Sequence, residues 1–252
     1  MSRAAVTVSF DNLGEVTELA RGEWSPDEPL GRHYSVTRAL PRVLALLDEL
    51  GLRATFFVEG RNTELYPDTL VALDAAGHEV AYHGWCHEQW AELGSGEEVE
   101  VLQRGLDALG GLGLRPRGFR PPGGRLTDGS VRALRDLGFA YCSPAGAGVH
   151  GLASFPFEWT LVDAYYYLPR FAPLREREQG AADVLSPSRF GAALEAGLRA
   201  AVGHGRHVSF VFHPFLTEPA ERFAVLREAL VAVRRSMDDG AVSCAPYREI
   251  AA

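Results

Sequence analysis

The sequence contains no lysine, and its 25 permanently basic side chains are all arginine. An enzyme without lysine cannot form a Schiff base through a lysine amine or use the lysine of a phosphate-binding loop. The sequence also has no apolar run that approaches the about 20 residues needed to span a bilayer. We therefore expect neither lysine chemistry nor a membrane partner.

Cysteine is scarce as well. Cys86, Cys142 and Cys244 give an odd count, and no two of them have the CxxC spacing. This usage predicts free thiols in a reducing compartment rather than a disulfide framework. The first ten residues, MSRAAVTVSF, contain no apolar signal region or cleavage site, so we expect a cytoplasmic protein.

The charge balance is acidic, with a formal net charge of -8, and no cluster of basic residues is evident. A nucleic-acid partner is therefore not expected, because phosphate binding requires a basic surface. Hydrophobic residues make up 46% of the 252 residues and charged residues 23%, which is ordinary for a globular protein. We expect one catalytic domain over residues 1–252.

Strand-like and helix-like segments alternate along the chain, as in a parallel α/β sheet or barrel. Long loops are predicted at 13–33 and 165–187. The absence of a Ser- or Pro-rich linker favours one closed or nearly closed barrel. The expected strands are 4–10, 54–58, 78–82, 118–120, 139–142, 153–163, 207–212 and 241–244, and the expected helices are 36–50, 67–76, 97–109, 130–137, 189–202 and 219–235.

Polar side chains stand at the carboxyl ends of several expected strands. In a βα barrel these ends converge on one face, so residues far apart in sequence can share a site. Two imidazoles four residues apart, with a carboxylate from another strand, can bind a divalent metal and leave positions for water and substrate. The candidates are Asp11, His83 with His87, Arg120, Asp163 and His213.

Five segments, taken in order, resemble the landmarks of the polysaccharide deacetylase family, also called NodB-homology domains or carbohydrate esterase family 4. The resemblance spans nearly the whole chain and implies an α/β fold, a distorted (β/α)7 barrel, and metal-dependent removal of acyl groups from amide nitrogen. The segments are Ser9-Phe10-Asp11-Asn12, Ala54-Thr55-Phe56-Phe57-Val58-Glu59-Gly60, His83-Gly84-Trp85-Cys86-His87, Phe119-Arg120-Pro121-Pro122-Gly123, and His213 after an apolar strand.

The resemblance also implies roles for individual residues. Asp11 matches the general base, and Arg120 matches the arginine that positions it. His213 matches the general acid, with Asp163 as a looser match to the aspartate that orients it. Trp159 is a candidate for stacking on a sugar. The His-Gly-aromatic form of the histidine motif is nearest to the cytoplasmic, allantoinase-like branch of the family.

One position departs from the family pattern: Asn12 stands where a second aspartate would bind the metal beside His83 and His87. An amide oxygen can bind a metal but lacks the full negative charge of a carboxylate. Three outcomes stay open: the metal binds through Asn12, Asp11 enters the coordination shell, or the site holds no metal.

The resulting hypothesis is a metal-dependent hydrolase that removes an acetyl or formyl group from an amino sugar or related small molecule. The expected cofactor is a divalent metal, with zinc favoured over cobalt, nickel or manganese, and the expected partner is a small-molecule or oligosaccharide substrate. Two alternatives remain: a hydrolase of a non-sugar amide or cyclic C–N bond, and a catalytically silent barrel that binds a glycan or a partner protein, the latter suggested by Asn12.

Overall fold

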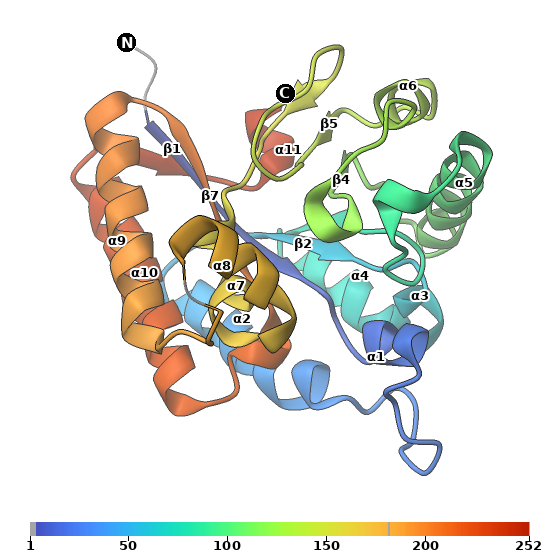
Figure 1. Ribbon diagram of the computed structural model, residues 1–252, viewed down its shortest axis with the longest axis horizontal. Helices are drawn as coiled ribbons and strands as arrows, with labels where there is room; N and C mark the ends of the chain where they lie inside the picture. Colours follow the sequence, from blue (N-terminus) through green and yellow to red (C-terminus); the bar gives the residue numbers. More distant parts are fainter. Residues whose placement is uncertain (1–3, 181, 252) are drawn as a thin grey trace.

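The computed structural model describes residues 4–180 and 182–251 and shows a parallel β-sheet with helices packed around it (Figure 1). The sheet has eight strands in the order β6-β5-β4-β3-β2-β1-β7, with β8 paired to β1. Every pairing between these strands is parallel. The strands are β1 (Ala4–Asp11), β2 (Thr55–Val58), β3 (Glu79–Tyr82), β4 (Gly118–Phe119), β5 (Tyr141–Cys142), β6 (Ala153–Ser154), β7 (His207–Phe212) and β8 (Val242–Cys244).

β1 pairs with three strands, β2, β7 and β8. Val6, Val8 and Phe10 are all fully buried, as expected for a parallel strand covered on both faces. Phe10 stacks on Phe56 of β2 with ring centroids 5.0 Å apart. This packing fixes the carboxyl end of β1, where Asp11 and Asn12 follow.

The helices surround the sheet, with α9 and α10 on one side and α5 and α6 on the other (Figure 1). They are α1 (Val16–Arg21), α2 (Leu40–Glu49), α3 (Asn62–Leu65), α4 (Pro67–Ala75), α5 (Ser95–Gly111), α6 (Ser130–Asp136), α7 (Asp163–Tyr167), α8 (Ala172–Gln179), α9 (Pro187–His204), α10 (Ala220–Asp238) and α11 (Tyr247–Ile250). Short 3-10 turns cover Trp90–Glu92, Pro122–Gly124, Trp159–Leu161 (η4), Pro169–Phe171 (η5) and Pro214–Leu216, and a π-helical turn, Ser35–Ala39, precedes α2.

The sheet curls but does not close with a regular ladder between β6 and β7. A single parallel bridge joins Val162 to Val211 there, and Ser209 donates a hydrogen bond to the carbonyl of Pro156 at 3.3 Å. This irregular seam confirms the single-domain α/β fold and the distorted barrel. The expected span of 1–252 includes residues 1–3, 181 and 252, which lie outside the described residues.

The strand expected over 153–163 is wrong for most of its length. Only Ala153–Ser154 pairs as a strand, with β5. Beyond Pro156, Phe157 makes one isolated bridge to Ala145, and the chain then turns into the 3-10 turn at Trp159. The apolar residues of this segment pack into the core, but most of its backbone has no neighbouring strand to pair with.

The segment 165–187, expected to be an irregular loop, contains most of α7, the 3-10 turn η5 and α8. Tertiary contacts organise it: Arg175 is fully buried and its guanidinium donates hydrogen bonds to the carbonyls of Leu168 at 3.0 Å and Ala182 at 2.9 Å. Local sequence preference gives no sign of such a buried cation.

The long loop expected at 13–33 is also partly wrong, because it contains α1. This short helix ends at Gly22, whose φ of 69° is the left-handed conformation that glycine adopts at helix ends. The other helices predicted from periodicity are confirmed within a few residues.

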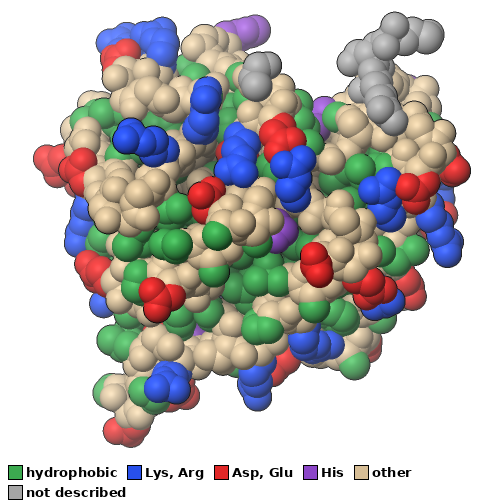
Figure 2. All heavy atoms as spheres, turned by 180° about the vertical axis from the view of Figure 1, so that it is seen from behind, with side chains coloured by type: hydrophobic (Ala, Val, Ile, Leu, Met, Phe, Trp, Pro, Cys, Tyr) green, Lys and Arg blue, Asp and Glu red, His purple; other side chains and the backbone are tan. Residues whose placement is uncertain are grey.

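No helix among the described residues is long and apolar enough to cross a membrane. On the face shown in Figure 2, arginine side chains are interspersed with acidic ones.

Candidate active site

The carboxyl end of β1 carries a buried ion pair. The Arg120 guanidinium donates to Asp11 Oδ1 at 2.7 Å and to Ser9 Oγ at 2.9 Å, and both charged side chains are at least nine-tenths buried. A buried arginine and carboxylate hold one another strongly because neither has water as an alternative partner. The pair joins β1 to the end of β4, although its members are 109 residues apart.

Further contacts hold Arg120 in place. Its Nη2 atom donates to Ser143 Oγ at 2.9 Å and to the Tyr247 hydroxyl at 3.1 Å. The guanidinium also lies 4.1 Å from the centroid of the Phe57 ring, in position for a cation–π interaction. Arg120 is therefore a fixed support for the Asp11 carboxylate rather than a mobile side chain.

His83 and His87 come from the loop that follows β3. Their ring centroids are 5.1 Å apart, and positive φ angles at Gly84 (80°) and His87 (60°) bend the backbone so that both rings line one cavity. His83 Nδ1 lies 2.8 Å from the Arg120 carbonyl. A carbonyl only accepts, so Nδ1 carries the proton and Nε2 keeps its lone pair.

Both imidazoles are neutral near pH 7. Burial lowers the pKa of His83 to about 3. Burial also lowers the pKa of His87, with additional effects from His83, Arg21 and Arg170. Neutral imidazoles are the form that binds metal.

Asn12 lies beside this pair in an unusual backbone conformation, with φ at 60°. Its Nδ2 donates to the fully buried Glu59, which also accepts from Asn62 Nδ2 at 3.0 Å. Because Nδ2 is committed to Glu59, Oδ1 is the atom of the Asn12 amide that remains for a ligand. Burial raises the pKa of Glu59 to about 8, against the smaller lowering effect of hydrogen bonds that include the one from Asn12.

The donor set fits a divalent ion through two neutral imidazoles and one amide oxygen, those of His83, His87 and Asn12. No group of three His, Cys, Asp or Glu side chains that could hold a metal occurs within 4–180 and 182–251, because the third donor is an amide. Zinc accepts imidazole nitrogen readily, and an amide oxygen is a permitted but uncharged third ligand. The one carboxylate among the described lining residues of the same cavity, that of Asp11, is already paired with Arg120.

A second buried pair supports His213, which follows β7. Asp163 accepts from His213 Nδ1 at 2.6 Å and from the His213 backbone N–H at 2.8 Å. The carboxylate therefore fixes the orientation and tautomer of the ring, leaving Nε2 as the nitrogen that can reach a substrate. Asp163 itself is 2% exposed and lies behind the histidine.

These groups share a cavity of about 70 Å³. Asp11, Asn12, His83, His87, Arg120 and His213 all line it, and Trp159 lines it together with Phe157 and Phe171. The three aromatic rings lie in a chain, with Trp159 5.1 Å from each of the other two. The structure thus places seven of the eight site residues predicted from the sequence in one cavity. The eighth, Asp163, is hydrogen-bonded to His213 and does not line the cavity itself.

Several site residues were missed by the sequence analysis. Glu59 lay within a recognised motif but received no role, and Ser143 and Tyr247, which hold Arg120, stand in no motif at all. Arg21 and Arg170 also line the cavity, and they come from the two segments expected to be loops. Only the position of Glu59, directly after a buried strand, was a usable signal.

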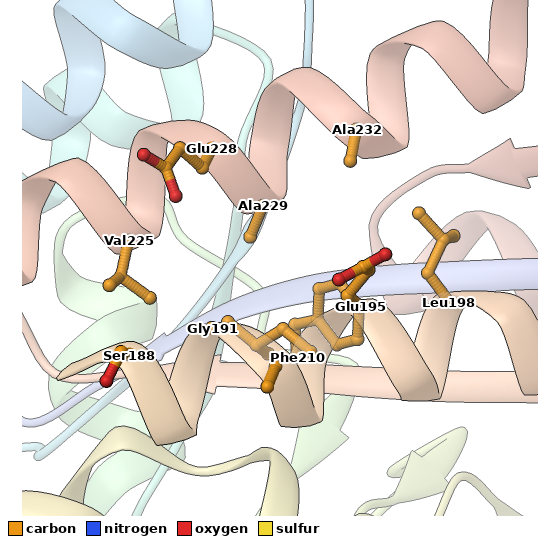
Figure 3. A pocket seen from close by; sticks show the side chains of 11 residues that line it. Ser188, Gly191, Glu195, Leu198, Phe210, Val225, Glu228, Ala229 and Ala232 are labelled. Atoms are coloured by element: carbon orange, nitrogen blue, oxygen red, sulfur yellow. The ribbon is translucent and has the colours of Figure 1, made fainter. Parts of the chain in front are cut away.

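A larger hollow of about 510 Å³ lies between α9 and α10 (Figure 3). Its described lining is mainly apolar, with Glu195 and Glu228 from the two helices, and includes no histidine, cysteine or arginine. That composition offers no acid–base pair or metal donor set, so the smaller cavity is the candidate active site.

Parts of the chain are similar to known deacetylases. A family model described as polysaccharide deacetylase matches residues 27–142. Peptidoglycan deacetylase-like protein FGM2 of Gibberella zeae is 33% identical over 103 residues, which cover 40% of this chain and 30% of that protein. Chitin deacetylase 1 of Saccharomyces cerevisiae is 39% identical over 95 residues, covering 37% of this chain and 31% of that protein. The matched region thus spans about a third of the length of these curated relatives.

Among solved structures, a putative polysaccharide deacetylase from Mycobacterium smegmatis superposes with a TM-score of 0.81 at 28% sequence identity. That match covers 100% of this chain and 90% of the other. The chain is therefore similar to polysaccharide deacetylases in sequence over residues 27–142 and in fold over its whole length.

Proposed function

We propose that this chain is a metal-dependent hydrolase that removes an N-acyl group, acetyl or formyl, from an amino sugar. One observation carries the proposal: two buried pairs, Arg120 with Asp11 and Asp163 with His213, present a carboxylate and an imidazole to the same cavity as His83 and His87. The names of the peptidoglycan and chitin deacetylases that match part of the chain support an amino-sugar substrate.

The divalent ion would be held by His83, His87 and the Asn12 amide oxygen, and when bound it supplies Lewis acidity toward water and the acyl carbonyl. Zinc is the metal we propose, with cobalt, nickel or manganese as replacements. His83 is held for this task by its Nδ1–H bond to the Arg120 carbonyl, an outer-shell contact of the kind that orients metal-binding histidines.

Asp11 is the proposed general base. It accepts a proton from the attacking water while Arg120 holds Oδ1 in place, so the carboxylate does not have to reorient during the reaction. His213 is the proposed general acid, which donates a proton from Nε2 to the departing nitrogen. Asp163, bonded to Nδ1, keeps the protonated ring in the required orientation.

The aromatic rings of Phe157, Trp159 and Phe171 form one wall of the cavity. Aromatic faces pack against the apolar faces of sugar rings and keep water away from the reacting group. This wall is the proposed site for the sugar ring that bears the acyl group.

The test is release of acetate or formate from N-acylated amino sugars by the purified protein, before and after treatment with a chelator. We expect activity to fall to background after chelation and to return on addition of zinc. Activity that survives complete removal of metal would refute the metal role. Activity on a panel of small amides but not on chitooligosaccharides would select the non-sugar alternative.

A catalytically silent barrel that binds a glycan is the second candidate, favoured by the Asn12 amide and its bond to Glu59. Elemental analysis that finds no metal, together with hydrolysis gained in Asn12→Asp, would select it. The cytoplasmic location and the allantoinase-like branch remain predictions, to be tested by fractionation of the source cells and by assay on allantoin.

A further inference from the structure

Two arginines lie at the candidate active site without a role in the chemistry proposed above. Arg21 ends α1 and Arg170 lies in η5, and both line the cavity that contains His87. Both arginines are themselves exposed to solvent. Neither guanidinium has a carboxylate within 4 Å among residues 4–180 and 182–251, whereas Arg227 and Arg248 have acidic partners at 2.8 and 3.2 Å.

The charges that line the cavity do not balance. Asp11 is the one acidic residue among its described lining side chains, and its charge is matched by Arg120. Two positive charges, on Arg21 and Arg170, are therefore left over in a protein whose formal net charge is -8.

The two cations also affect one another. Partial loss of water around Arg170 and the nearby charge of Arg21 lower the pKa of Arg170 to about 10, against smaller opposing effects from Glu23 and Glu18. Glu18 forms its ion pair with His33 at 3.2 Å, and neither Glu18 nor Glu23 lies within 4 Å of either guanidinium. Placing two cations together costs free energy unless an anion lies between them.

We propose that Arg21 and Arg170 bind an anionic group of the substrate, so that the preferred substrate is an N-acylated amino sugar carrying a carboxylate or phosphate. This inference rests on the proposed hydrolase function. Arginine is suited to both anions because its planar guanidinium makes paired hydrogen bonds with two oxygens. Arg170 is the chain neighbour of Phe171 in the aromatic wall, which places the anion beside the sugar ring.

Binding of three compounds to the metal-loaded full chain tests the proposal: N-acetylglucosamine, N-acetylmuramic acid, which adds a carboxylate, and N-acetylglucosamine 6-phosphate. Calorimetry measures the affinities without requiring turnover. We expect at least one acidic compound to bind about a hundredfold more tightly than the neutral sugar, about tenfold for each guanidinium. Whether the carboxylate or the phosphate is preferred identifies the anion.

The variants are Arg21→Gln, Arg170→Gln and the double substitution. Arg115→Gln is the matched control, because Arg115 is exposed, precedes β4 and does not line the cavity. We expect each single variant to reduce the preference about tenfold and the double variant to abolish it, while the control keeps it. Melting temperatures verify that the variants are folded.

Equal affinity for acidic and neutral sugars in the unmodified protein, or a preference that persists in the double variant, would overturn the inference. A preference lost in the arginine variants of a protein that hydrolyses none of the compounds would support the anion site and count against the hydrolase proposal. Hydrolysis of neutral and acidic sugars with equal kcat/KM would support the hydrolase proposal and count against the anion site.

Discussion

Exchanging the amide and the carboxyl between Asn12 and Glu59 tests whether position 12 supplies the third metal ligand beside His83 and His87. In the structure Asn12 Nδ2 donates to Glu59, which is fully buried and accepts a second bond from Asn62 at 3.0 Å. Burial raises the pKa of Glu59 to about 8, so the unfolding is measured above that pH, where Asn12→Asp alone places two carboxylates in contact away from water. We expect it to lower the free energy of unfolding by about 1–3 kcal/mol, the usual penalty for an unsatisfied buried polar group.

Adding Glu59→Gln restores a complementary pair, because the new Nε2 donates to the new carboxylate while Oε1 still accepts from Asn62. The double variant Asn12→Asp/Glu59→Gln should therefore recover most of that loss, giving a coupling energy of about 1–3 kcal/mol in a double-mutant cycle. It also moves the carboxylate to the side that faces His83 and His87. Zinc should then bind about tenfold to a hundredfold more tightly than in the unmodified protein.

The assay is urea unfolding of the four proteins of the cycle in the presence of chelator, followed by zinc titration of each. Strictly additive stability changes would show that the two side chains do not interact as the structure shows. Unchanged zinc affinity in the double variant would show that position 12 is not a metal ligand, and would leave Asp11 as the carboxylate to examine.

Three further predictions concern histidines and their partners. His87→Ala should lose both bound zinc and activity, and full zinc content measured by elemental analysis would remove His87 from the metal site. Asp163→Asn should keep its zinc but lower kcat by about a hundredfold or more, because His213 loses the partner that fixes its tautomer; an unchanged kcat would mean that Asp163 only packs behind the ring. Burial and, less strongly, Arg120 lower the pKa of His207 from 6.5 to about 4, so the unfolded chain takes up a proton at this residue before the folded protein does. Stability is then complete above pH 6.5 and falls by about 3 kcal/mol as the pH drops to 4, a loss that His207→Gln should remove in urea melts at a series of pH values.

Much of the fold could be predicted because its signals are local. The β-branched run before Asp11 and the apolar periodicity of residues 36–50 depend on neighbours in sequence, and both gave the observed element within a few residues. The segments that failed depend on distant partners. α7 and α8 are held by the buried Arg175, whose guanidinium donates hydrogen bonds to carbonyls before and after α8. The spacing of apolar residues in the sequence does not predict such a contact.

The residues of the candidate site also divide into those that local sequence could place and those that depend on distant partners. Asp11, His83 and His213 could be placed because the ends of parallel strands meet on one face of a barrel. The hydrogen bond between Asn12 and Glu59 joins residues 47 positions apart, and only the folded chain shows that the departure at position 12 has a buried partner. Arg21 and Arg170 were missed because the segments that carry them were expected to be loops.

The central claim is that Asp11 acts as the base for N-acyl hydrolysis in this cavity. The most direct measurement is acetate release from an N-acetylated amino-sugar oligomer by zinc-loaded protein, compared between the unmodified chain and Asp11→Asn. The amide oxygen introduced by this substitution can still accept from Arg120, so the variant should stay folded and bind zinc. We expect a fall in kcat of about a hundredfold or more; equal rates in the two proteins would show that Asp11 is not the base.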